Sequence, residues 1–92
     1  MTVRIQTTIP GISEEQFDAM HKIIISGEPP KGLLFHSSAP VDGGWGVIDF
    51  WESRQDYDAA MPVVQKAMES AGITPQGPPS VEEFPVHETF QP

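Results

Sequence analysis

GGWGVIDFWES, residues Gly43–Ser53, is an apolar run that carries two tryptophans and one aspartate and ends in a helix signal. Alternate side chains of a strand point to opposite faces, so Trp45, Asp49 and Trp51 would share one face, with Phe50 on the other. The near-continuous hydrophobicity predicts a strand that is buried on both faces and lies in the middle of a sheet.

The residues before this stretch predict its partner strand. Residues 33–38, LLFHSS, are typical of a strand, and residues 39–44 hold a proline, an aspartate and two glycines. So short a connection favours a hairpin, so we expect the two strands to pair antiparallel. The first strand is expected at residues 2–8, where β-branched and polar residues alternate.

Two amphipathic helices complete the pattern. The first is expected to begin at Ser13, where Gln16 completes a capping box, and to end near residues 26–27. The second is expected over residues 54–71, capped by Ser53, with a kink or short break near Met61 because Pro62 cannot donate a backbone hydrogen bond.

The C-terminal part is expected to form a rigid connection and a last strand. Residues 73–81, ITPQGPPSV, are too rich in proline and glycine for regular structure, and residues 82–90 predict a strand in which Pro85 marks an edge or a bulge. The resulting order, β-α-β-β-α-β, predicts an α+β ferredoxin-like fold with a four-stranded antiparallel sheet, formed by residues 1–92 as one domain. We expect the strand order 4-1-3-2.

Length and charge restrict the possible partners. A chain of 92 residues has a thin core, and without cysteine it has no disulfide to stabilise it, so we expect a homodimer. The net charge of −8 argues against nucleic acid and against anionic membranes. No basic and apolar leader and no long apolar run are present, so we expect a cytoplasmic protein.

Asp49 is the first candidate for a functional residue. A buried carboxylate needs a hydrogen-bond donor or becomes protonated. The hairpin would bring His36 opposite or one step from Asp49, although a register error of one residue would put His36 on the other face. The alternative is that a tryptophan or a backbone amide satisfies Asp49, which then has only a structural role.

The other two histidines lie in different surroundings. His21 falls in the apolar stripe of the first helix, where a partly buried structural histidine is the simpler interpretation, and His87 lies on the last strand. With His36 they could converge on a cleft and hold a divalent metal. None shows the local spacing of metal ligands, so we expect no metal.

Aromatic residues could form the wall of a ligand site. Trp45, Trp51, Tyr57 and Phe35 would suit a flat aromatic ligand, but aromatics also dominate the core of any small protein. The sequence has no glycine-rich phosphate loop, no Gly-x-Ser-x-Gly elbow and no cysteine nucleophile. These absences argue against phosphoryl transfer, acyl transfer and nucleotide binding.

The element order and the stretch GGWGVIDFWESRQDYDAAM resemble the dimeric α/β-barrel superfamily, in particular small proteins of the antibiotic biosynthesis monooxygenase type. The resemblance implies that two sheets face each other across a dimer and that each subunit keeps a cleft between sheet and helices. The superfamily includes cofactor-free oxygenases, haem enzymes, isomerases and members without known activity. Its haem-degrading members carry a ligating histidine on the second helix, and residues 54–71 contain none.

These observations lead to one functional hypothesis and its rivals. We expect a homodimer that binds a small aromatic or polycyclic molecule and oxidises it without a cofactor, with His36 or Asp49 as the base. Trp45, Trp51 and Tyr57 would hold the ring. The rivals are a non-catalytic ligand-binding or stress-response dimer, a metal- or haem-dependent enzyme, and an isomerase or cyclase.

Overall fold

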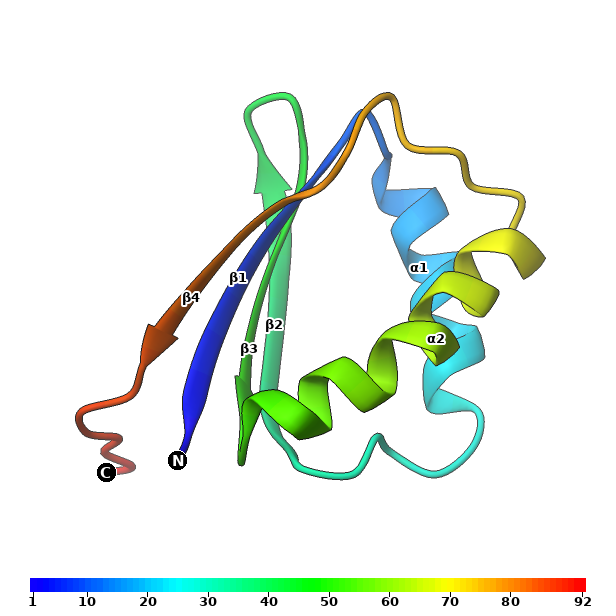
Figure 1. Cartoon of the computed structure of the whole chain (residues 1–92). Coiled ribbons are helices and arrows are strands. Elements are labelled where there is room, and N and C mark those ends of the chain that lie inside the picture. The colour runs from blue at the N-terminus through cyan, green and yellow to red at the C-terminus, as the bar shows by residue number, and fades with distance from the viewer.

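In the computed structural model, which describes residues 1–92, a four-stranded antiparallel sheet carries both helices on one face (Figure 1). The elements in chain order are β1 (Val3–Pro10), α1 (Glu14–Ile25), β2 (Leu33–Val41), β3 (Gly44–Trp51), α2 (Arg54–Ser70) and β4 (Ser80–Pro85). The strands lie in the order β2-β3-β1-β4. The predicted ferredoxin-like fold is therefore confirmed, together with the sheet order and the central position of β3.

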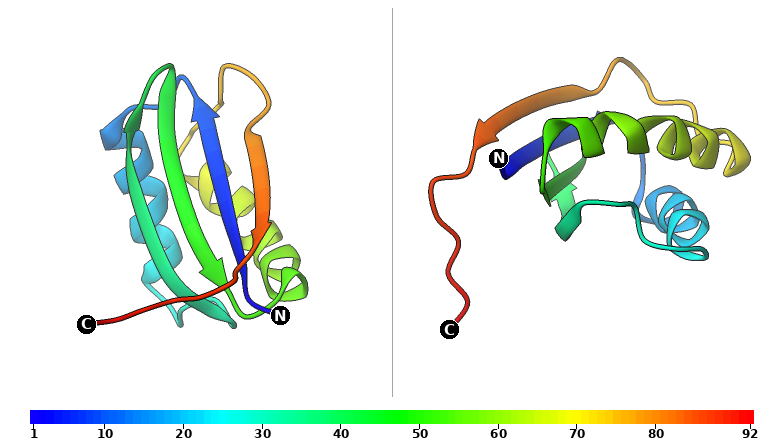
Figure 2. Two further views of the ribbon diagram at one scale, coloured as in Figure 1. Left: turned by 90° about the vertical axis from the view of Figure 1, so that its left-hand side faces the viewer. Right: turned by 60° about the horizontal axis from the view of Figure 1, so that its bottom comes forward.

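The strand ends differ from the prediction. β2 continues to Val41, so the turn of the hairpin is only Asp42 and Gly43, and Gly43 adopts a φ of 81° that suits glycine. β4 ends at Pro85, and its extension to residue 90 was wrong because proline cannot donate to a ladder. Residues 86–92 leave the sheet on the side without helices (Figure 2).

Both helices begin as the capping residues indicate. The Gln16 amide donates to Ser13 Oγ over 3.2 Å while the Ser13 amide donates to the Gln16 side chain over 2.9 Å, which completes the capping box. Ser53 Oγ accepts from the Asp56 amide at the start of α2. These caps fix where each helix leaves the sheet.

Pro62 lies inside α2 without interrupting it, so the expected break is not found. Pro62 is exposed, so the backbone carbonyl that loses its helical partner lies on the outer side of the helix, where water can replace the bond. Neither helix of the protein has the length and hydropathy needed to cross a membrane.

The core beneath the helices consists of two separate clusters. One contains Ile9, Ile12, Phe17, Met20, Trp45, Val47, Ala67 and Ile73. The other contains Val3, Ile5, Trp51, Tyr57 and Ala60. Side chains between the two clusters line a cavity, so the helices do not close completely onto the sheet.

Candidate functional site

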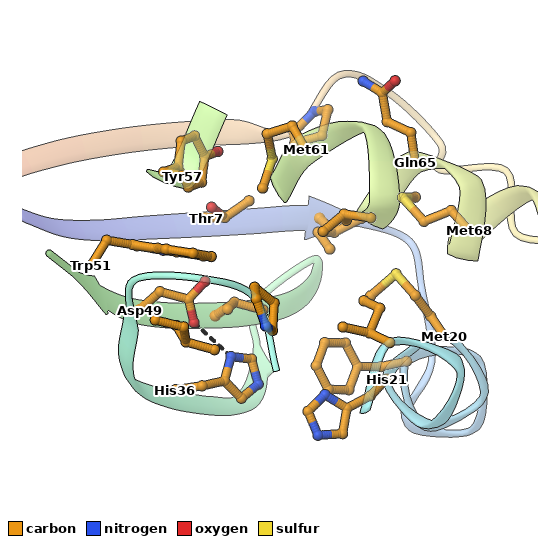
Figure 3. Close-up of a pocket in the computed structure, with 18 of the residues that line it drawn as sticks. Thr7, Met20, His21, His36, Asp49, Trp51, Tyr57, Met61, Gln65 and Met68 are labelled. Carbon is orange, nitrogen blue, oxygen red and sulfur yellow. Dashed lines mark hydrogen bonds and ion pairs between the residues drawn. The ribbon is translucent and has the colours of Figure 1, made fainter. Parts of the chain in front are cut away.

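The cavity between the sheet and the helices has a volume of about 460 Å³ (Figure 3). Binding sites for drug-sized molecules commonly lie in the range of roughly 300–1,000 Å³. Most of its lining is apolar, and the exposed lining residues are Ile25 at the end of α1, Pro29 after it, Gln65 on α2, Pro79 before β4 and Val81 on β4. The site is therefore a mostly apolar chamber that solvent reaches along these segments.

The two long walls of the cavity differ in chemistry. The helix wall is mostly apolar and rich in thioethers but includes three polar side chains; its members are Phe17, Met20, His21, Ile24, Ile25, Tyr57, Met61, Val64, Gln65 and Met68. The sheet wall carries the one carboxylate of the lining, Asp49; its other members are Thr7, Ile9, Leu33, His36, Val47, Trp51 and Val81. Polar ligand atoms can therefore find partners on both walls, and methionine side chains on the helix wall can adapt to ligand shape.

A direct pair between His36 and Asp49 is the main polar feature of the sheet wall. The residues face each other across β2 and β3, and His36 Nδ1 lies 2.6 Å from Asp49 Oδ1. The suggested pairing is thus confirmed. An ionised carboxylate can only accept, so His36 carries its proton on Nδ1. His36 is 26% exposed and Asp49 16% exposed at their side chains, and both line the cavity.

A β-bulge interrupts β2 on the side of His36 that is away from the hairpin turn. The pairing shifts between Leu33 and Phe35, so Leu34 has no partner of its own on β3. Leu33 and His36, three positions apart, would point to opposite faces of a regular strand, yet both line the cavity. The extra residue therefore allows the apolar start of β2 and the imidazole to face the same chamber.

The second ring nitrogen of His36 has no partner. Its Nε2 is buried and makes no hydrogen bond. Leaving such an atom unpaired costs about 1–3 kcal/mol, and with the proton on Nδ1 this atom carries a free lone pair. The lone pair is available to accept a proton or a hydrogen bond from a ligand.

Aromatic rings are stacked above this nitrogen. The His21 ring lies 5.0 Å from the His36 ring at an angle of 14°, and the Phe17 ring lies 5.6 Å from the His21 ring. Trp45 continues the stack against Phe17 at 5.4 Å. Burial, then the nearby His36, lower the pKa of His21, while Asp18 and Asp49 oppose this effect. His21 therefore favours its neutral form in the stack.

Trp51 and Tyr57 form the end of the cavity that adjoins the second core cluster. Their rings meet edge to face with centroids 5.9 Å apart. Burial raises the pKa of Tyr57, and the nearby Arg54 and the Thr7 hydroxyl lower it by less. The phenol therefore remains protonated at neutral pH and can donate a hydrogen bond.

The structure brings five of the eight candidate residues to the cavity: His21, His36, Asp49, Trp51 and Tyr57. Trp45 shares their face of the sheet but packs into the first core cluster and does not line the chamber.

Two expectations for the site must be corrected. Phe35 follows the bulge, is 58% exposed and contacts Phe50 on the helix-free face of the sheet. His87 lies in the exposed segment after β4 because Pro85 ends that strand. Neither residue lines the cavity, and no group of three potential metal ligands gathers anywhere in the structure.

Sequence reasoning missed several lining residues. The helix residues Met20, Ile24, Met61 and Met68 belong to the apolar stripes of the two helices, and their spacing gives no sign that the helices stand away from the sheet. Thr7 offered a weak signal, since it interrupts the apolar face that Val3, Ile5 and Ile9 form on β1.

A scan against protein-family models gives no match to the sequence, and neither does a search of curated proteins. Solved structures do match in fold. One is a mutant of SnoaB, a cofactor-independent oxygenase from Streptomyces nogalater. It superposes with a TM-score of 0.62 at 14% identity over 97% of this chain and 94% of that one. A candidate antibiotic biosynthesis monooxygenase from Chloroflexus aurantiacus gives 0.65 at 13% identity over 98% of each chain.

A third similar structure is a mutant of MhuD with two manganese protoporphyrin IX molecules bound per active site. It gives a TM-score of 0.66 at 20% identity over the full length of both chains. The expected likeness to proteins of the antibiotic biosynthesis monooxygenase type is thus confirmed for the fold.

A haem-type cofactor would find no histidine on the second helix of this protein. Helix α2 lines the chamber with Tyr57, Met61, Gln65 and Met68 and offers no imidazole. His36 Nε2 is buried, so a haem iron could reach it only after the same movement of neighbouring rings that any other ligand requires.

Proposed function

We propose that the protein binds a planar aromatic molecule in the cavity and oxidises it with dioxygen, without a prosthetic group. The observation that carries this proposal is the His36–Asp49 pair in the wall of a mostly apolar chamber. A partly buried imidazole with a carboxylate on Nδ1 and a bare Nε2 has the arrangement of a general base. The likeness in fold to a cofactor-independent oxygenase supports the same reaction class.

The proposed reaction begins with proton transfer. His36 Nε2 accepts the proton of a phenol, or of the carbon acid that is its keto tautomer, and Asp49 stabilises the imidazolium through Nδ1. The resulting carbanion gives its electrons to dioxygen, so that a carbon–oxygen bond forms. The second proton of this carbon passes to the terminal oxygen as the O–O bond breaks, so the carbon becomes a carbonyl and hydroxide leaves. The balance is R₂CH₂ + O₂ → R₂CO + H₂O, and His36 returns the proton to the leaving hydroxide.

The groups around the pair would place the ring. Trp51 and Tyr57 offer an aromatic end wall, and the protonated Tyr57 hydroxyl can donate to a ligand oxygen. The apolar lining excludes water from the carbanion. These contacts orient the reacting carbon, which is the main contribution of a site that supplies no redox group.

Turnover of anthrone, the keto tautomer of 9-hydroxyanthracene, tests the proposal directly. We expect the wild-type protein to accelerate formation of anthraquinone, with oxygen uptake equal to product. Asp49→Asn should lower the rate by roughly 10²–10⁴-fold, the usual contribution of a general base. Asp42→Asn, in the exposed hairpin turn, is the matched control and should leave the rate unchanged. A rate equal to that of buffer would reject the oxygenase.

A binding protein without catalysis is the second candidate. It is favoured by the burial of His36 Nε2, which no ligand reaches while the stack remains closed. Quenching of tryptophan fluorescence by anthrone, without product formation, would select this function.

We also propose that the protein is a homodimer that joins the helix-free faces of two sheets. Across this face the residues Phe35, Phe50, Arg4 and Phe84 lie in one register row, and the Arg4 guanidinium lies over the Phe84 ring at 4.5 Å. On the four β1 positions of this face and their cross-strand partners, only Arg4 and Glu82 are charged, in a chain of net charge −8. Sedimentation should give a dimer, and Phe50→Glu should give a monomer.

A further inference from the structure

The His21 ring is the aromatic neighbour nearest to the His36 ring, whose second nitrogen is buried. The two rings are nearly parallel at 5.0 Å, and Phe17 is parallel to His36 within 2° at 6.2 Å. His36 Nε2 has neither exposed surface nor a protein partner. The atom that the proposed reaction needs is therefore shielded by the stack, and the reaction requires that part of the stack move.

Among these rings, His21 is best placed to move. Phe17 is buried in the first core cluster and packs against Trp45. His21, by contrast, is a partly exposed residue of α1. Figure 3 shows the His21 ring beside the α1 backbone, between that helix and His36. A rotation about its own side-chain bonds would uncover His36 without a change in the core.

The charges around His21 give it two states. Asp18, three positions earlier on α1, is exposed, while His36 on β2 and Asp49 on β3 face the ring from the sheet. The residues of α2 that line the cavity are uncharged at neutral pH. Burial and His36 disfavour the charged ring in the stack, and Asp18 offers it a partner at the surface.

We propose that His21 is a positioning residue that controls access to His36 Nε2, covering it when stacked and exposing it after turning toward Asp18. The ligand then occupies the place that the His21 ring leaves beside His36. The consequence for catalysis rests on the proposed function, but the covering of His36 does not.

Chemical modification of His36 tests the covering without any ligand. Diethyl pyrocarbonate reacts with an accessible neutral imidazole nitrogen, and peptide mass spectrometry reads each histidine separately. The exposed His87 in the same chain is the internal reference. In the wild type we expect His36 to react much more slowly than His87. His21→Ala should raise the His36:His87 ratio by about tenfold, the upper limit set by one lost aromatic pair.

His21→Phe is the matched variant, because its ring can stack on His36 but cannot take a proton. It should keep the His36:His87 ratio as low as in the wild type. Far-ultraviolet circular dichroism of each variant identifies any that fails to fold, and either variant alone decides the question. An unchanged ratio in His21→Ala, or a raised ratio in His21→Phe, would overturn the proposal.

The rate of anthrone association gives the second readout. From about pH 8 to about pH 5, the wild-type rate should increase as His21 gains its proton and leaves the stack, whereas His21→Phe should show no such increase. Equal pH profiles for the two proteins would contradict the proposed control of access by His21.

The two proposals can fail separately. If His36 is modified slowly in the wild type but the protein neither binds nor oxidises anthrone, the covering of His36 is retained and the proposed function is rejected. If the protein oxidises anthrone but His36 is modified as fast as His87, the proposed function is retained and the covering of His36 is rejected.

Discussion

His36 and Asp49 are directly opposed on adjacent strands, and their side chains meet at 2.6 Å on the face of the sheet that carries the cavity. The opposed position explains how an edge strand and a central strand together supply a base and its carboxylate. It also makes the pair a measurable unit of stability.

A double-mutant cycle should measure the pair. His36→Phe keeps a ring in the stack, and Asp49→Asn keeps the shape of the carboxylate. Hydrogen bonds to charged groups contribute about 1.5–3 kcal/mol, so we expect a coupling free energy near the lower end of this range for a partly exposed pair. Urea unfolding of the four proteins gives the value. A coupling within error of zero would show that the pair does not persist in solution.

Tyr57 should resist ionisation. Burial raises its pKa above the usual value of 10.0, so the folded state favours the protonated phenol. Its contribution to stability is fully present below about pH 10 and is lost as the pH rises through the folded-state pKa. Because the chain has one tyrosine, phenolate absorbance reports this residue alone. If the Tyr57 phenol titrates at its ordinary pKa in the folded protein, Tyr57 is not buried as the structure places it.

Filling the cavity should separate stability from binding. Val64 lines the chamber, so Val64→Phe should stabilise the fold by about 0.5–2 kcal/mol and abolish quenching by anthrone. The same substitution at its exposed neighbour, Val63→Phe, should change stability by less than about 0.5 kcal/mol and leave binding intact. Thermal unfolding with and without anthrone measures both quantities. Retained binding in Val64→Phe would place the ligand elsewhere.

Gly44 should be intolerant of any side chain. A Cβ atom at this position would lie 2.1 Å from the carbonyl oxygen of Ile9, and a paired backbone cannot move aside easily. We expect Gly44→Ala to cost about 1–3 kcal/mol in the free energy of unfolding. Gly27→Ala, where a Cβ meets nothing within 4 Å, should be close to neutral. Similar chemical denaturation midpoints for both variants would contradict this close approach.

The fold could be predicted because its signals are local. Each signal depends only on residues close together in the sequence. These signals are the capping box at Ser13, the Ser53 cap, and the alternation that puts Trp45 and Trp51 on one face of β3 and Phe50 on the other. Where a boundary failed, the cause was proline: Pro85 ends β4 early, while Pro62 is accommodated on the exposed side of α2.

The site could be predicted only in part. The His36–Asp49 pair and the outward position of Phe35 both follow from hairpin geometry and strand alternation, but the inward position of Leu33 depends on the bulge, which no residue of LLFHSS indicates. The chamber itself depends on how far α1 and α2 stand from the sheet. Met61 and Met68 have the same helical spacing whether they fill a core or line a cavity, so only the tertiary structure distinguishes these cases.

The unpaired Leu34 has a consequence for comparisons with other chains of this fold. The hairpin turn sets the face of His36, and the bulge lies beyond it. A gain or loss of one residue at Leu34 would therefore turn Leu33 away from the chamber while the imidazole stayed opposite Asp49. Alignments of such chains must be anchored on the hairpin turn and counted toward the bulge. Two sequences that match on both sides of this position can differ in whether the start of β2 closes the chamber.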